Sequence, residues 1–140
     1  MSYILSKKFK FEAAHRLAKG YVGKCANIHG HSWYVTVQLS CHNLNQQDMG
    51  IDYAEINTFN ESIRKEFDHK LLLCKDDTTL LSVCKKENYE VVTFDENPTS
   101  ETIAKTVYDK AKGYFSSYKN IDMHQVIVEE TCTSACYYKP

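Results

Sequence analysis

The sequence has no long hydrophobic run, because its aliphatic blocks, such as Leu71–Leu73, are only a few residues long. A membrane-spanning helix needs about 20 mostly apolar residues, so we expect no membrane partner. The first residues also lack the apolar stretch of a signal peptide, which predicts a cytoplasmic protein. Proline and glycine are scarce, at 2 and 5 residues, and this excludes collagen-like and low-complexity chains.

An excess of charge of one sign is also missing, since 17 Lys and Arg face 18 Asp and Glu. Proteins that bind nucleic acids usually carry a basic footprint, so we expect no nucleic-acid partner. The six cysteines are even in number, as in disulfide frameworks. In a cytoplasmic protein, free thiols or metal and catalytic roles are the better interpretation. The length of 140 residues predicts one domain, residues 1–140.

Alternation of apolar and polar residues marks the strands. Residues 3–14 and 31–42 alternate with a period of two, which predicts half-buried strands that can pair antiparallel across the loop between them. Residues 122–130 and 134–139 are expected to form two more strands. Residues 74–97 are predicted to be mostly loop, with a short strand at 89–94.

Two helices are expected between these strand pairs. Asp52 can cap a helix over 53–67, with Glu55 three residues later as its capping-box partner. A second helix is predicted from the Thr99–Ser100 cap to about residue 117. Two helices segregated on one face of an antiparallel four-stranded sheet, in the order ββααββ, define an α+β fold.

The segment from Cys25 to His31 carries the densest chemical signal. In a strand, alternate residues share a face about 6.6 Å apart, so His29 and His31 point together, on the apolar face of Trp33. His15 ends the first strand on its apolar side and can add a third nitrogen. Three neutral imidazoles suit a tetrahedral Zn²⁺ ion.

Other interpretations of this segment remain open. Three histidines without a fourth ligand leave an open coordination position, which is typical of a catalytic zinc. With Cys25 as the fourth ligand the site would be structural. The three histidines can also be ordinary hydrogen-bonded side chains, since a His-x-His pattern alone is a weak motif.

Two further segments carry carboxylates in informative positions. Asp68 beside His69 can fix an imidazole tautomer, but adjacent residues on a helix diverge, and a histidine favoured by the helix dipole is an alternative. Glu130 shares its strand face with Val126 and Val128, so it is expected at the edge of the core. A carboxylate there needs a partner, and a heterocycle with an N–C–NH₂ edge would offer two donors. A surface acid at the strand end is the alternative.

Taken together, these segments resemble the 6-pyruvoyltetrahydropterin synthase and 6-carboxytetrahydropterin synthase family. The matches extend from end to end, apart from residues 74–96, where this chain looks longer than compact bacterial members, and Leu73, where the family often has Asn. The six matching segments are Phe11–Leu17, Lys24–Ser32, Ile51–Glu55, Asp68–His69, Asn97–Glu101 and Glu130–Thr133.

The resemblance implies the tunnelling fold, in which subunits join their sheets into a β-barrel, usually as a homohexamer of two trimers. Active sites then lie between subunits, so that Asp68 and His69 of a neighbouring chain can reach the zinc. It also implies the substrate, 7,8-dihydroneopterin triphosphate, and zinc-dependent loss of triphosphate.

The roles of individual residues follow from the resemblance and the residue chemistry together. Metal binding is assigned to His15, His29 and His31, and catalysis to Cys25 as a proton-abstracting thiolate with Asp68 and His69 as a relay. Glu130 is expected to grip the pterin edge, and Thr99, Ser100 and Glu101 to line the same pocket. Lys24 or Arg16 is a candidate for meeting the triphosphate.

The most specific expectation concerns which reaction product is formed. Ser32 and the tail from Glu130 to Tyr137 look more like the 6-carboxy enzymes, which release acetaldehyde and serve queuosine and 7-deazaguanine synthesis. The alternative within the family is 6-pyruvoyltetrahydropterin, formed without carbon–carbon cleavage. The alternative from another class is a non-catalytic zinc scaffold with a closed Cys-His₃ site.

Overall fold

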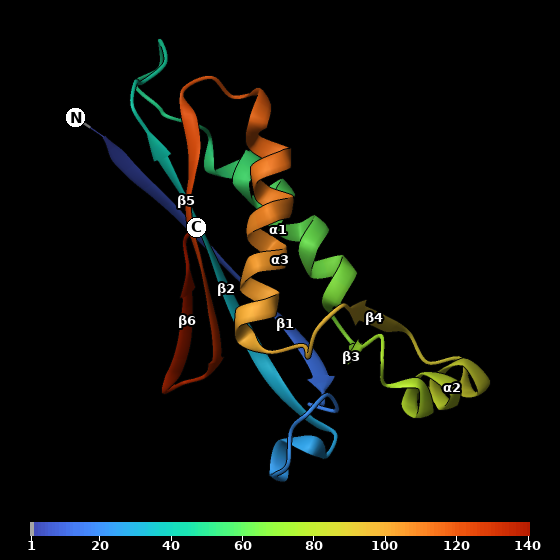
Figure 1. The fold of residues 1–140 in the computed structure, drawn as a ribbon. Helices are drawn as coiled ribbons and strands as arrows, with labels where there is room; N and C mark the ends of the chain where they lie inside the picture. The colour runs from blue at the N-terminus through green and yellow to red at the C-terminus, as the bar shows by residue number, and fades with distance from the viewer. Residues whose placement is uncertain (1) are drawn as a thin grey trace.

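The structure, a computed structural model, describes residues 2–140 and consists of one curled mixed sheet with helices packed against it (Figure 1). The strands lie in the order β4-β3-β1-β2-β5-β6. The elements in chain order are β1 (Tyr3–His15), η1 (Lys24–Ala26), β2 (His29–Cys41), α1 (Tyr53–Phe67), β3 (Lys70–Cys74), α2 (Thr78–Glu87), β4 (Val91–Phe94), α3 (Ser100–Tyr114), η2 (Phe115–Ser117), β5 (Ile121–Thr131) and β6 (Ser134–Tyr138).

The antiparallel part of the sheet agrees with the sequence prediction. β1 and β2 pair in register along their full length, with Phe11 opposite Trp33 and His15 opposite His29. β2 pairs with β5, and β5 with β6, in the antiparallel sense. The alternation is confirmed, because the apolar faces of these strands are buried and make up much of the core.

The prediction of a four-stranded antiparallel sheet is wrong, because β3 and β4 extend it with parallel pairing. β3 pairs with the end of β1, and β4 pairs with β3. Leu72, Leu73 and Cys74 are consecutive and all buried. A strand covered on both faces shows a continuous apolar run instead of alternation, so a period of two does not reveal it.

The prediction of mostly loop over residues 74–97 is also wrong, since this segment contains a third helix, α2. Asp77 caps it by accepting a hydrogen bond from the backbone N–H of Leu80 at 3.4 Å, and Asn88 ends it in the left-handed conformation. Cys84 is its one buried residue. Its apolar residues lie within Leu80–Cys84, and a stretch this short does not establish a 3.6-residue stripe in the sequence. The strand expected at 89–94 is present as Val91–Phe94.

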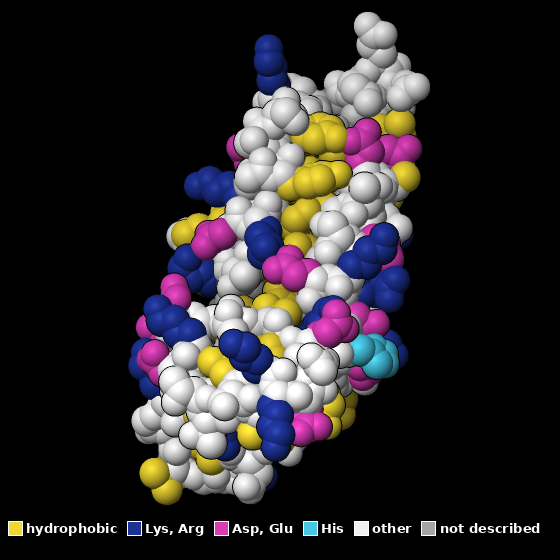
Figure 2. Space-filling view, turned by 90° about the vertical axis from the view of Figure 1, so that its right-hand side faces the viewer, with side chains coloured by type: hydrophobic (Ala, Val, Ile, Leu, Met, Phe, Trp, Pro, Cys, Tyr) yellow, Lys and Arg dark blue, Asp and Glu magenta, His cyan; other side chains and the backbone are white. Residues whose placement is uncertain are grey.

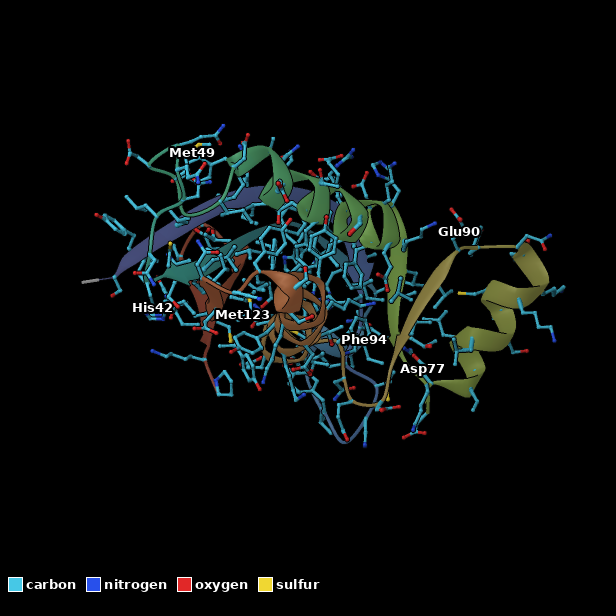
Figure 3. All side chains as sticks on the ribbon, turned by 90° about the horizontal axis from the view of Figure 1, so that it is seen from above. His42, Met49, Asp77, Glu90, Phe94 and Met123 are labelled. Carbon is cyan, nitrogen blue, oxygen red and sulfur yellow. The ribbon has the colours of Figure 1, made fainter. Side chains whose placement is uncertain are left out.

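The two long helices lie inside the curve of the sheet, while α2 stands apart beyond β4 (Figure 3). Asp52 caps α1, as predicted, by accepting from the N–H of Ala54 at 2.8 Å. Glu55, its expected capping-box partner, instead accepts a hydrogen bond from the Tyr118 hydroxyl. None of the helices described over residues 2–140 is long and apolar enough to cross a membrane.

Stacked aromatic rings join the sheet to α1 near the end that carries the histidines. The ring of Phe11 lies 6.2 Å from Trp33 and 5.4 Å from Phe67, centroid to centroid. All three side chains are almost fully buried, so this end of the core is rigidly packed. On the outside, Figure 2 shows positive and negative side chains interspersed over one face, in keeping with the balanced charge.

Asn60 on α1 is fully buried, and its amide nitrogen and oxygen have no hydrogen-bond partner within the described chain. Burying an unpaired polar group costs about 1–3 kcal/mol. We therefore expect Asn60→Leu, which has a similar volume, to raise the free energy of unfolding by about that amount in urea denaturation. Asn57→Leu, on the exposed side of the same helix, should change it by less than about 0.5 kcal/mol. A less stable Asn60→Leu protein would show that the amide is bonded after all.

A three-histidine centre fit for a metal ion

Three histidines converge at the adjoining ends of β1 and β2. His15 is the last residue of β1 and pairs with His29, the first residue of β2, while His31 pairs with Ala13. One potential ligand atom from each histidine and one from Glu130 all lie within 4.8 Å of one another. The structure therefore brings together the three residues that the sequence predicted as metal ligands.

Backbone carbonyls set the orientation of two of the imidazoles. Nδ1 of His15 lies 2.7 Å from the carbonyl oxygen of Pro98, and Nδ1 of His29 lies 2.7 Å from that of Asn27. A carbonyl oxygen only accepts hydrogen bonds, so each Nδ1 carries the proton. Both Nε2 atoms then present lone pairs, which is how ligand histidines are usually held.

The geometry of the Nε2 atoms fits a cation at this point. Nε2 of His15 and Nε2 of His29 are 3.0 Å apart, and two lone pairs facing each other repel unless a positive charge lies between them. Nε2 of His31 is buried and makes no hydrogen bond among residues 2–140, although Oε1 of Glu130 lies 3.0 Å away. A metal ion bound by the three nitrogens would satisfy all of them.

Burial keeps two of the three imidazoles, those of His15 and His31, in the form that binds metals. Desolvation lowers the pKa of His15, whose exposed fraction is only 2%, and it also lowers the pKa of His31. Both rings are therefore neutral near pH 7, and a neutral ring nitrogen can donate its lone pair to Zn²⁺.

Glu130 lies beside the three histidines. Its Oε1 is 3.0 Å from Nε2 of His31 and 3.4 Å from Nε2 of His15. It points to the core side of β5, as the alternation predicted, whereas Glu129 on the opposite face pairs with Lys8 at 2.7 Å. The sequence did not indicate that Glu130 touches the imidazoles, because this depends on the register between β2 and β5.

Cys25 lies outside the group of four possible ligands within the described chain. It sits in the short turn η1, where its backbone carbonyl accepts a hydrogen bond from the N–H of Leu17 at 2.9 Å. The neighbouring Cys25 side chain raises the pKa of the Tyr21 hydroxyl. The arrangement gives no support to a closed Cys-His₃ site.

Asp68 and His69 contact each other directly. Sequence analysis treated them as diverging helix residues, but α1 ends at Phe67 and His69 has a positive φ of 59°. Oδ2 of Asp68 consequently lies 3.1 Å from Nδ1 of His69. The N–H of Glu12 donates to Oδ1 of Asp68 at 2.9 Å and lowers the pKa of Asp68, so the carboxylate stays charged beside the ring.

Two grooves border the histidine centre. His31 and His69 line one groove of about 690 Å³, although they come from β2 and from the turn before β3. His31 also lines a second groove of about 600 Å³ together with Glu130 and Thr131. A small molecule in the first groove would contact His31 and His69, and one in the second would contact His31 and Glu130.

The Thr99–Glu101 turn begins α3 beside the centre. The hydroxyl of Thr99 accepts the N–H of Thr102 at 3.3 Å, which confirms the predicted cap. The backbone N–H of Glu101 donates to its own carboxylate and lowers the pKa of Glu101. Pro98, just before this turn, supplies the carbonyl that orients His15. The sequence does not reveal this role, because a backbone acceptor has no side-chain signature.

Fold and site together define an α+β protein in which three imidazoles are placed to hold a metal ion, and one of them, His31, lines two surface grooves. Residues 4–140 match the family of 6-pyruvoyl tetrahydropterin synthase, and the chain belongs to this family.

The relatives span nearly the whole chain. The 6-carboxy-5,6,7,8-tetrahydropterin synthase of Bacillus subtilis is 28% identical over 99% of this chain and 86% of its own length. The enzyme of that name from Aquifex aeolicus is 29% identical over 99% of both chains. Among solved structures, the 6-pyruvoyl tetrahydropterin synthase of Caenorhabditis elegans superposes with a TM-score of 0.76 at 24% identity, covering 100% of this chain and 96% of that one.

Proposed function

We propose that this protein is a zinc-dependent lyase of the 6-carboxytetrahydropterin synthase type. It would convert 7,8-dihydroneopterin triphosphate and one water molecule into 6-carboxy-5,6,7,8-tetrahydropterin, acetaldehyde and triphosphate, a step in queuosine biosynthesis. The relatives named for this product span almost the whole chain. The observation that carries the proposal is the convergence of His15, His29 and His31 beside two open grooves.

The three histidines are the residues that would hold the zinc ion. Pro98 and Asn27 fix two of the rings so that their Nε2 lone pairs point inward. When bound, zinc supplies a Lewis acid that stabilises negative charge developing on a substrate oxygen.

The remaining residues would move protons and hold the substrate. Cys25, as a thiolate, removes a proton from the substrate side chain, since thiolates form readily near positive charge. Asp68 orients His69 through their 3.1 Å contact, which frees Nε2 of His69 to exchange a proton in the groove shared with His31.

The pterin ring is assigned to the groove beside Glu130. The carboxylate of Glu130 would accept two parallel hydrogen bonds from the N–C–NH₂ edge of the ring, a strong and directional arrangement. Thr99, Ser100 and Glu101 would line the same pocket from the start of α3, next to the carbonyl that orients His15.

The proposal includes an assembly in which copies of the chain join their sheets into a β-barrel, as a cytoplasmic homohexamer of two trimers. β4 and β6 are the two edges of the sheet, and edge strands offer unpaired backbone groups to another strand. We take residues 1–140 as a single domain, because strands from both ends of the chain belong to the same sheet.

Mass spectrometry of the product tests the function. The zinc-loaded protein is incubated with 7,8-dihydroneopterin triphosphate, and we expect 6-carboxytetrahydropterin together with acetaldehyde. A product with the mass of 6-pyruvoyltetrahydropterin and no acetaldehyde would identify the other reaction of the family. No turnover despite bound zinc would favour a non-catalytic zinc scaffold.

Glu130→Gln tests the pterin assignment. The amide keeps the volume but replaces one acceptor with an NH₂ donor, so one hydrogen bond to the ring should be lost. The loss of a bond to a charged partner is worth about 1.5–3 kcal/mol, and we expect KM to rise about 10- to 150-fold in steady-state assays.

Glu129→Gln is the matched control, since Glu129 pairs with Lys8 on the other face of β5. It should leave KM nearly unchanged, and both variants should keep their zinc. If Glu130→Gln loses zinc instead, the carboxylate is a metal ligand, in line with its 3.0 Å distance from Nε2 of His31.

A further inference from the structure

Arg16, the residue after His15, forms a two-point ion pair with Asp77. Nε of Arg16 donates to Oδ2 of Asp77 at 2.6 Å, and Nη2 donates to Oδ1 at 2.6 Å. The Asp77 side chain is only 3% exposed and that of Arg16 is 29% exposed. A fork of two parallel charge-assisted bonds fixes both partners in direction as well as distance. The pair therefore ties the end of β1 to the segment between β3 and β4.

Asp77 is also the residue that starts α2. Its Oδ1 accepts from the N–H of Leu80 at 3.4 Å, and its carbonyl accepts from the N–H of Leu81 at 3.0 Å. Figure 3 labels Asp77 where the chain enters α2, and the rest of the helix extends away from the sheet. The first turn of α2 is thus the part that is anchored to the end of β1.

The chain that follows Arg16 returns toward the centre at Cys25. The N–H of Leu17 donates to the carbonyl of Cys25 at 2.9 Å, which closes the loop between them at its base. Because Leu17 is next to Arg16, the position of this base depends on where the guanidinium is held.

A second clamp holds the same loop on its other side. The N–H of Lys19 donates to Oδ1 of Asn97 at 2.9 Å, and Nδ2 of Asn97 donates to the carbonyl of Lys19 at 2.7 Å. The next residue, Pro98, accepts the bond from Nδ1 of His15. The loop is therefore fixed between Asp77 on one side and the Asn97–Pro98 turn on the other.

We propose that Asp77 is a positioning residue of the histidine centre. Through Arg16 it holds the end of β1 and the base of the loop, and so keeps Nε2 of His15 and the thiol of Cys25 in place. The guanidinium of Arg16 then serves as an internal partner of Asp77 and not as a cation for the triphosphate. The inference rests on the proposed function for the identity of the metal and for the role of Cys25.

The variant Asp77→Asn tests the proposal. Asn caps helices about as well as Asp, so α2 keeps its start, while Arg16 loses its charged partner. The zinc dissociation constant is measured by competition with a chelator, and the visible spectrum is recorded on the cobalt-substituted protein, both without substrate. We expect zinc to bind roughly 10-fold more weakly, at the lower end of the effect of outer-shell changes, with a shifted cobalt spectrum.

Asp76→Asn is the matched control. Asp76 is the preceding residue, its side chain is 60% exposed, and its carboxylate lies 4.0 Å from Nζ of Lys19. This variant should bind zinc like the parent protein. Arg16→Lys keeps the positive charge but loses the two-point hydrogen bond to Asp77, and it should also weaken zinc binding, by a smaller factor. If Asp77→Asn does not fold, the zinc affinity of Arg16→Lys tests the proposal instead.

Two results would overturn the proposal. An unchanged zinc constant and cobalt spectrum in Asp77→Asn, with only a lower melting temperature, would show that the pair is merely structural. Weaker binding of inorganic triphosphate by Arg16→Lys, with zinc binding unchanged, would make Arg16 an anion-binding residue. Failure of the parent protein to turn over the pterin would count against the proposed function alone, since the zinc and cobalt measurements need no substrate.

Discussion

His29→Ala should abolish both metal binding and turnover. The ring of His29 is fixed by the carbonyl of Asn27, and its Nε2 lies 3.0 Å from Nε2 of His15, so its removal takes away one of three converging nitrogens. Two histidines on adjacent strands rarely hold zinc firmly, because structural and catalytic sites use three or four protein ligands. Zinc content by mass spectrometry and acetaldehyde release are the two measurements.

His42→Ala is the matched control for this prediction. His42 follows the opposite end of β2, is 56% exposed and pairs with Asp122 at 3.2 Å. It should keep both the zinc and the activity of the parent protein. Full activity of His29→Ala, or of protein stripped of metal, would show that the centre does not carry the reaction.

Cys25→Ala should retain zinc and lose most of the rate. A positioned base typically contributes a factor of roughly 10²–10⁴ to the rate. We therefore expect the turnover number to decrease by a factor in that range. The zinc should stay because the sulfur lies outside the group of His15, His29, His31 and Glu130 in the described chain. The measurements are zinc content and steady-state kinetics on the same preparation.

Cys132→Ala, in the exposed turn between β5 and β6, is the cysteine comparison; because Cys132 lines the groove beside Glu130, we expect a loss of rate much milder than that of Cys25→Ala. Collapse of the zinc content in Cys25→Ala would instead make Cys25 a ligand. A rate equal to that of the parent would remove Cys25 from the proposed chemistry.

Much of the fold could be predicted because it rests on local periodicity. The alternation in β1 and β2 is clear over most of their length, and their pairing places His15 opposite His29. β3 and α2 could not be predicted in this way. The strand is apolar on both faces and so lacks a period of two. The helix is only ten residues long and its apolar residues lie within Leu80–Cys84, a stretch too short to establish a helical period.

The candidate site likewise has some features that local periodicity predicts and others that only the tertiary structure shows. The shared face of His29 and His31 follows from a period of two, and so does the side of β5 on which Glu130 lies. The hydrogen bond between His15 and the carbonyl of Pro98 joins residues 83 positions apart. The hydrogen bond between Arg16 and the carboxylate of Asp77 joins residues 61 positions apart. Such contacts depend on the tertiary arrangement, and a single sequence carries no pattern for them.

The most direct test of the account is to measure acetaldehyde and triphosphate together while zinc is added back to metal-free protein. The account predicts that both products appear in equal amounts, and that their rate of formation rises until about one zinc ion is bound per chain. Formation of both products at the full rate by metal-free protein would contradict the assignment of the three-histidine centre. Triphosphate released with zinc but without acetaldehyde would contradict the proposed 6-carboxytetrahydropterin product.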